Sequence, residues 1–71
     1  MFCFEVLGYY FNSDKGFFVL HIAGDMPGVK GKAVDQVFVY ANRIEGGKID
    51  IGSLVKVYRD AKGYVQGVEV I

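Results

Sequence analysis

The sequence predicts an all-β fold, a small barrel of five antiparallel strands. Runs of apolar residues, rich in β-branched and aromatic side chains, each end at a cluster of Gly, Asp, Asn or Pro. The 71 residues are 52% hydrophobic and include 10 Gly but only 1 Pro, which favours a packed β domain with many turns. Five short strands in one domain, residues 1–71, favour a closed or nearly closed barrel, because the edges of an open sheet invite aggregation.

The first two predicted strands are joined by a turn. The first strand covers residues 2–11 and the second covers residues 17–23. Asn and Asp side chains in the segment between them can bond to their own backbone, and Gly16 can take a positive φ. We therefore expect a tight turn over residues 12–16.

A basic loop and a third strand follow. Residues 24–32 contain one proline, three glycines and two lysines, which predicts a mobile, basic loop. The third strand covers residues 33–41. Residues 42–52 have too few periodic apolar positions for a helix, so we expect a loop there, with a short 3₁₀ turn near residues 42–45.

The last two predicted strands, residues 53–59 and 64–71, form a hairpin around residues 60–63. The Asp-Ala-Lys-Gly sequence of that segment suits a type I turn closed by a glycine in the left-handed region. One face of the hairpin carries the valines expected in the core, Val55, Val57, Val68 and Val70. The other face places Lys56 across from Glu69, where the two charges can pair.

The second and third strands both carry aromatic residues on the face opposite the core, because side chains alternate along a strand. The expected core set is Phe18, Leu20, Ile22, Val37, Val39 and Ala41. The opposite set is Phe17, Val19, His21, Gln36, Phe38 and Tyr40. Exposed rings beside lysines are suited to stacking unpaired bases, each stack contributing about 1–3 kcal/mol. The alternative is that Phe17 and Phe38 are core residues of a barrel packed on both faces.

Two segments resemble the RNA-binding motifs of cold-shock proteins. The segment Tyr-Phe-Asn-Ser-Asp-Lys-Gly-Phe, residues 10–17, resembles the first motif, and Asp-Gln-Val-Phe-Val-Tyr, residues 35–40, resembles the second. The similarity extends over residues 5–70. It implies an OB-type barrel of five strands whose second and third strands present aromatic side chains to single-stranded RNA or DNA.

The resemblance also implies a role for individual residues. Tyr10 stands for the family's usual Trp, Lys15 for its phosphate-contacting lysine, and Phe17 and Phe38 for its stacking phenylalanines. Tyr40 replaces the usual His and can still stack and donate a hydrogen bond.

Further contacts are expected at the margins of this surface. His21 can act as a stacking partner at its edge, and Lys30 and Lys32 in the long basic loop can contact phosphates. For the two lysines the alternative is a solvated loop with incidental charge.

The chain departs from the family pattern at three ring positions. Phe18 and Val19 stand where the family has Gly then Phe, Ala41 stands where another Phe is expected, and Gly46 falls near a third aromatic position. Fewer rings predict weaker binding, since each stacked base contributes about 1–3 kcal/mol. The alternative is that this surface has a different function.

Composition argues against several other classes of function. Eight basic and eight acidic side chains give zero net charge, which does not favour binding to duplex phosphates by bulk charge. Cys3 has no partner for an internal disulfide, and Cys3 and His21 are too few for a structural zinc site, so we expect no metal or cofactor and a packed core thiol in a reducing cytoplasm. No apolar run reaches the roughly 20 residues that span a bilayer. No motif supports catalysis, so we expect neither an enzyme nor a membrane protein.

The leading hypothesis is therefore a binder of single-stranded RNA or DNA that acts as a nucleic-acid chaperone. The first alternative is a protein-interaction or oligomerisation module, including a homodimer, that uses the same rings. The second alternative is a helix-destabilising protein of phage or plasmid type that coats single-stranded DNA cooperatively as a dimer.

Overall fold

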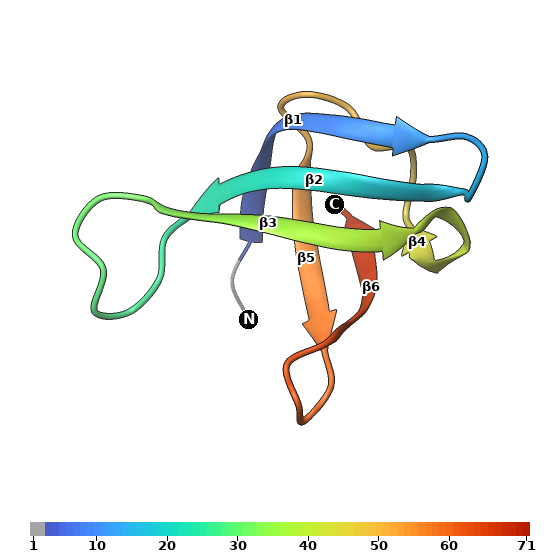
Figure 1. Ribbon diagram of the computed structural model, residues 1–71. Coiled ribbons are helices and arrows are strands. Elements are labelled where there is room, and N and C mark those ends of the chain that lie inside the picture. Colours follow the sequence, from blue (N-terminus) through green and yellow to red (C-terminus); the bar gives the residue numbers. More distant parts are fainter. Residues whose placement is uncertain (1–2) are drawn as a thin grey trace.

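The computed structural model describes residues 3–71 and is all-β, with six strands in one sheet and a short 3₁₀ helix (Figure 1). The elements in chain order are β1 (Cys3–Asn12), β2 (Phe17–Gly24), β3 (Ala33–Tyr40), η1 (Ala41–Arg43), β4 (Ile44–Glu45), β5 (Leu54–Arg59) and β6 (Val65–Val70). The three-residue η1, the one helical element of residues 3–71, is far shorter than a helix that crosses a membrane.

The five predicted strands are present as β1, β2, β3, β5 and β6, each with ends within one residue of those expected. Phe2, the first residue of the predicted first strand, lies outside the described residues. The predicted strand count is wrong, because β4 forms inside the segment expected to be a loop. Ala41 was expected to end the third strand as a core residue, which is also wrong: it begins η1 and is exposed.

The sheet has the order β3-β2-β1-β5-β6-β4, so β1 joins the part made of β2 and β3 to the part made of β5, β6 and β4. β1 pairs with β2 on one edge, from Phe4 to Asn12, and with β5 on the other edge, at Cys3, Phe4 and Glu5 only. A register shift in the β2 pairing between Val6 and Gly8 follows the part of β1 that pairs with both strands. Such a bulge bends a strand, which allows β1 to run across with β2 and β3 and also to join β5 and β6, which cross them (Figure 1).

The sheet curls but does not close into a barrel. The edge strands are β3 and β4, and no hydrogen-bonded ladder joins them within residues 3–71. The chain leaves β3 through η1 and enters β4, which pairs in parallel with β6 at Ile44 and Glu45 only. Gly46 ends this pairing: its φ is +86°, and a Cβ there would overlap the Val70 carbonyl oxygen.

The curled sheet encloses a small aliphatic core. Its buried residues are Val6, Leu20, Ile22, Val37, Val39, Ile49, Val55 and Val68. Phe18, Val57 and Val70 pack against this core and are partly buried. The predicted core faces of the second, third and last two strands are thus largely present, whereas Ile49 comes from a segment where no core residue was expected.

Two smaller expectations about packing are wrong. Cys3 is exposed rather than a core thiol, because it lies at the start of β1 beyond the buried part of the strand. Lys56 does lie opposite Glu69 in the register, yet they form no ion pair. Glu69 instead accepts a hydrogen bond of 2.8 Å from the hydroxyl of Tyr58.

Candidate nucleic-acid interface

Three neighbouring strands align the predicted binding residues in rows across the outer face of the sheet. β2 pairs with β1 and β3 without interruption from Phe17 to His21, so residues on the same face stand directly beside one another. From one end of the strands to the other, the rows are Asn12-Phe17-Tyr40, Tyr10-Val19-Phe38 and Gly8-His21-Gln36. The face of β2 and β3 opposite the core therefore carries rings in two adjacent rows.

We call the rings of this face, Tyr10, Phe17, Phe38 and Tyr40, the aromatic platform; the last three contact one another. The Phe17 and Phe38 rings stack with centroids 4.2 Å apart and planes at 28°. Tyr40 meets both rings edge-on, with centroids 6.3 Å from Phe17 and 5.7 Å from Phe38. Tyr10, Phe38 and Tyr40 are 57%, 50% and 53% exposed, and Phe17 is partly buried.

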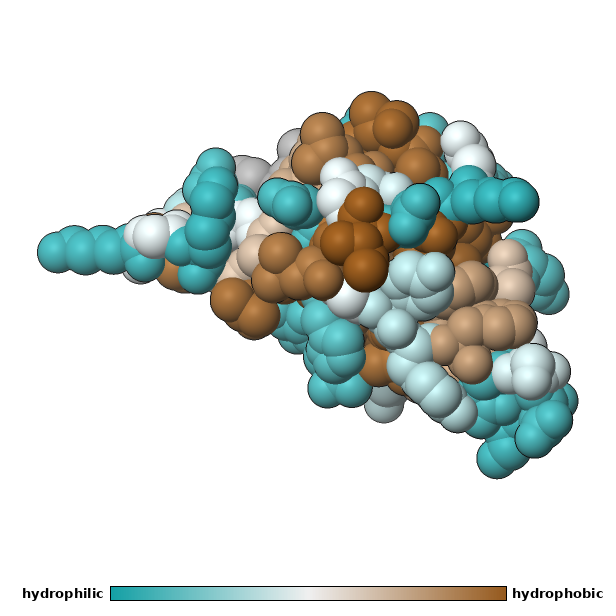
Figure 2. Space-filling view, turned by 90° about the horizontal axis from the view of Figure 1, so that it is seen from above, coloured by the Kyte–Doolittle hydropathy of each residue, from teal (hydrophilic) through white to brown (hydrophobic). Residues whose placement is uncertain are grey.

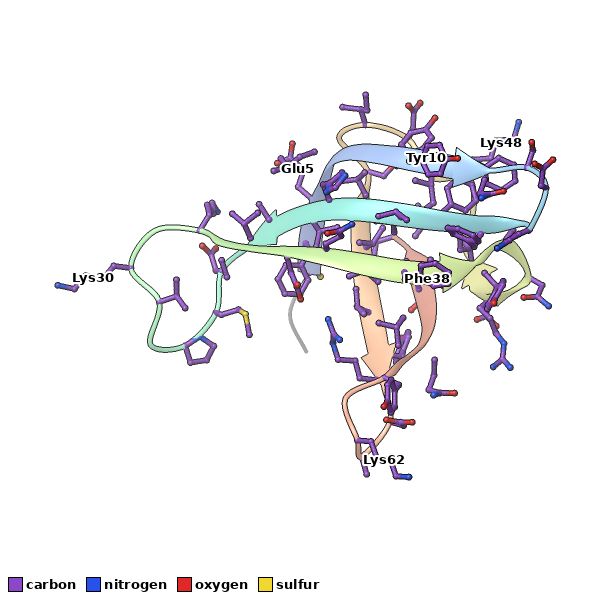
Figure 3. The ribbon with its side chains drawn as sticks, in the orientation of Figure 1. Glu5, Tyr10, Lys30, Phe38, Lys48 and Lys62 are labelled. Carbon is purple, nitrogen blue, oxygen red and sulfur yellow. The ribbon has the colours of Figure 1, made fainter. Side chains whose placement is uncertain are left out.

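Tyr10 reaches the platform from the far side of β2. It projects from β1, whereas Phe38 projects from β3, with β2 running between the two strands (Figure 3). Val19, the β2 residue between them in the row, is a partly buried aliphatic side chain. Because Val19 carries no ring, Tyr10 is separated from the stacked pair.

The turn between β1 and β2 fixes one end of the platform. The side-chain oxygen of Asn12 accepts hydrogen bonds from the amides of Asp14 and Lys15, at 3.0 and 3.1 Å. The amide of Ala41 donates to the carbonyl oxygen of Gly16 at 2.9 Å, which ties the turn to the residue after β3. Lys15 is exposed on this turn, three residues after Asn12, which pairs with Phe17 in the end row of the platform strands.

The remaining predicted residues lie at different distances from the rings. His21 is exposed on the same face, opposite Gln36, one row beyond Phe38. Lys30 points outward from the tip of the long β2–β3 loop, away from the platform (Figure 3). The ammonium group of Lys32 is 3.1 Å from a carboxylate oxygen of Asp25 in the same loop. The structure thus brings His21 to the platform but neither loop lysine.

A second set of rings lies on the inner side of the same strands: Phe18, which the sequence predicts on this side, and Tyr9 and Phe11, which sequence reasoning missed. Phe18 contacts Phe11 at a centroid distance of 4.6 Å and Tyr9 at 5.9 Å. The bulge before Gly8 shifts the alternation of β1, so that Tyr9 and Phe11 face the same side as Phe18. These rings line an apolar groove of about 460 Å³ at the open end of the sheet. The signal in the sequence was the run of three aromatic residues that ends at Phe11. Which of these rings face inward depends on the bulge.

The chemistry available at this surface is that of contact and stacking. Across residues 3–71 no three His, Cys, Asp or Glu side chains gather where they could bind a metal ion. Flat rings next to a lysine and a histidine offer π faces, one cation and one imidazole, which suit bases and phosphates. Comparisons of the chain with protein-family models, curated protein sequences and solved structures give no match.

Proposed function

We propose that this protein binds single-stranded nucleic acid by stacking bases on the aromatic platform. The observation that carries the proposal is the set of half-exposed rings on one face of three hydrogen-bonded strands. A ring held on paired strands loses little freedom when a base stacks on it, and each such stack contributes about 1–3 kcal/mol. Phe38 and Tyr40 offer adjacent surfaces for two bases, and Tyr10 offers a third across Val19.

We further infer that the fold is of the OB type, as a partly open barrel. In this architecture the second and third strands carry the oligonucleotide-binding face, which matches the position of the platform on β2 and β3. The support lies in the chain path: β1 pairs with both β2 and β5, and the chain after β3 turns through η1 to pair in parallel with β6.

Weak, stacking-based binding suits a nucleic-acid chaperone. A protein that binds only the unpaired state shifts the equilibrium of a weak stem toward that state by mass action. The chain has zero net charge, and Lys15 is the predicted phosphate contact at the platform. We therefore expect a shallow dependence on salt, with a slope of about −0.7 per phosphate contacted on a single strand.

A titration with an oligothymidylate tests the proposal. Addition of the oligonucleotide should quench tyrosine fluorescence, and the amide signals of Tyr10, Lys15, Phe38 and Tyr40 should shift together in heteronuclear NMR spectra. A duplex of the same length should bind far more weakly, because its bases are not free to stack. An unchanged spectrum at high micromolar oligothymidylate would refute the proposal.

A specific observation favours self-association as a second candidate function. Backbone bonds from Val6 to Ser53 and from Ile71 to Leu54 bring together aliphatic residues outside the platform. Leu7, Ile51, Leu54 and Ile71 are 50%, 69%, 49% and 62% exposed. Apolar side chains gather on the face that contains β1 and the segment before β5 (Figure 2), and extended apolar patches commonly mark protein contacts.

Light scattering at increasing protein concentration tests this candidate. A dimer that dissociates on Leu54→Ser, with unchanged oligothymidylate affinity, would assign the aliphatic patch to self-association. A monomer at all concentrations would eliminate it. The double variant Phe17→Ala and Phe38→Ala separates the two candidates, since only the stacking function requires those rings.

A further inference from the structure

The groove on the inner side of the sheet is a preformed hollow, on the face opposite the platform. We call it the inner groove. We call the rings of β1 and β2 that line it, Tyr9, Phe11 and Phe18, its floor, and the lining residues of the segment after β3, Ala41, Ile44, Gly47, Lys48 and Ile49, its wall. Its volume of about 460 Å³ lies within the range of about 300–1,000 Å³ typical of small-molecule sites. Tyr9 and Lys48 are the lining residues with a polar side-chain group, and the other six are apolar.

The hollow exists because small residues stand on its wall. Ala41 and Gly47 project little or nothing into the space that the three rings leave open. The wall is fixed from both sides: Gly46 packs against the backbone of Val70, and Ile49 is buried in the core at 7% exposure. A wall anchored in this way does not collapse onto the rings, so the groove stays available to a ligand.

The groove and the platform lie on opposite faces of the same strand ends. Phe11 and Phe18 on its floor are the chain neighbours of Tyr10 and Phe17, so they point to the opposite face of the same strand ends, and Ala41 on its wall directly follows Tyr40. Lys48 extends from the same end of the molecule as the β1–β2 turn (Figure 3). A strand of nucleic acid that passes over Tyr40 therefore has to turn round the end of β3 to reach the groove, at the end of the molecule where Lys48 lies.

We propose that the inner groove takes one base of the same single strand, splayed away from its neighbours, while Lys48 contacts the adjacent phosphate. The proposal rests on the proposed function. Unstacked bases of single strands are commonly splayed out and stacked on aromatic side chains. The three rings supply the π surface, the Tyr9 hydroxyl a hydrogen-bonding group, and Lys48 the one positive charge of the lining.

Oligothymidylates of two lengths test the proposal, since one OB domain covers about 4–16 nucleotides. An oligomer of about three nucleotides should shift the amide signals of Tyr10, Phe38 and Tyr40 only. An oligomer of about eight nucleotides should in addition shift those of Gly47, Lys48 and Ile49. An abasic residue at the end that reaches the groove should remove the second set of shifts and leave the first.

Two variants measure the contribution of the groove. Ala41→Leu fills the hollow and should weaken binding of the longer oligomer by roughly five- to a hundredfold, the loss of one stacked base, while the affinity of the shorter one stays unchanged. Lys48→Gln alters only an exposed charge and should reduce the salt slope of the longer oligomer by about 0.7. Ala61→Leu and Lys62→Gln, both on the exposed β5–β6 turn, are the matched controls and should change neither value.

The outcomes separate this inference from the proposed function. The groove assignment alone is overturned if the longer oligomer shifts the amide signals of the platform but not those of the groove. It is also overturned if both variants keep the affinity and the salt slope of the unmodified protein. Absence of shifts anywhere overturns both. Groove signals that move with protein concentration in the absence of nucleic acid would overturn the assignment in favour of a second copy of the chain.

Discussion

The Phe17 and Phe38 rings stack diagonally across two strands, with centroids 4.2 Å apart and planes at 28°. In the register, Phe17 lies opposite Tyr40 and Phe38 lies opposite Val19, so the contact joins residues of successive rows. Each ring covers one face of the other. Phe38 remains 50% exposed, whereas Phe17 is partly buried and supports it.

This arrangement predicts different effects for the two phenylalanines. Phe38→Ala should weaken oligothymidylate binding by roughly five- to a hundredfold, the loss of one stack, with a small effect on unfolding because the ring is half exposed. Phe17→Ala should weaken binding to a similar extent and also lower stability, because it removes a partly buried ring. Fluorescence titration and urea unfolding measure the two quantities.

Tyr64→Ala provides the control for both variants. Tyr64 is 68% exposed and precedes β6, on the β5–β6 hairpin rather than on the platform strands. Its replacement should leave the affinity unchanged. Equal losses of affinity in all three variants would show that aromatic content in general, and not the platform, determines binding.

The platform could be predicted from the sequence, whereas its surroundings could not. The alternation of β2 and β3 is unbroken, so Phe17, Phe38 and Tyr40 share a face as simple periodicity requires. The parallel pairing of Ile44 with Val68 depends on how distant parts of the chain meet, and no local pattern announces a strand of two residues. Ile49 likewise lies in a polar segment whose pattern does not predict a core residue. It is buried because the sheet curls around it.

The ion pair between Arg59 and Asp35 joins β5 to β3 across the open side of the sheet. One guanidinium nitrogen is 3.0 Å from a carboxylate oxygen of Asp35, and another donates to the Gly63 carbonyl oxygen at 3.0 Å. Because both side chains are substantially exposed, we expect a coupling of only about 0.2–1 kcal/mol. A double-mutant cycle with Arg59→Gln and Asp35→Asn, followed by urea unfolding, measures it.

The Arg59–Asp35 coupling can be compared at low and high salt, and with the coupling of a second ion pair. Raising the ionic strength should reduce the Arg59–Asp35 coupling by screening. The Lys32–Asp25 pair is more exposed and lies within one loop, so the same cycle applied to it should give a coupling near zero. A larger coupling in the loop than across the open side would contradict this view of what ties β3 to β5.

Gly46 is required for the return of the chain after β4. Its φ is +86°, and an added Cβ would overlap the carbonyl oxygen of Val70. Gly46→Ala should therefore cost more than the roughly 1–2 kcal/mol of a left-handed conformation alone, since the backbone must also shift. Gly52→Ala is the matched control, because its φ is +89° with open space around the Cβ position. Similar losses of unfolding free energy in the two variants would contradict a steric role for Gly46.

The Tyr58–Glu69 hydrogen bond predicts a dependence of stability on alkaline pH. The bond of 2.8 Å, together with slight burial and the charges of Glu69 and Glu45, raises the pKa of the Tyr58 phenol above its ordinary value of 10.0. The hydroxyl donates only while protonated, so folding favours the neutral phenol. Its contribution to stability is therefore complete below the ordinary pKa and is lost as the pH rises through the higher pKa of the folded protein.

Tyr58→Phe should accordingly lower the urea midpoint at neutral pH, and the gap to the unmodified protein should close as the pH rises above about 10. Unfolding curves recorded at neutral and at increasingly alkaline pH measure this difference. Tyr64→Phe, at a residue that is 68% exposed, should show no gap at any pH. A gap for Tyr58→Phe that stays constant into the alkaline range would mean that the hydroxyl acts through packing, because only a bond that needs its proton disappears on ionisation.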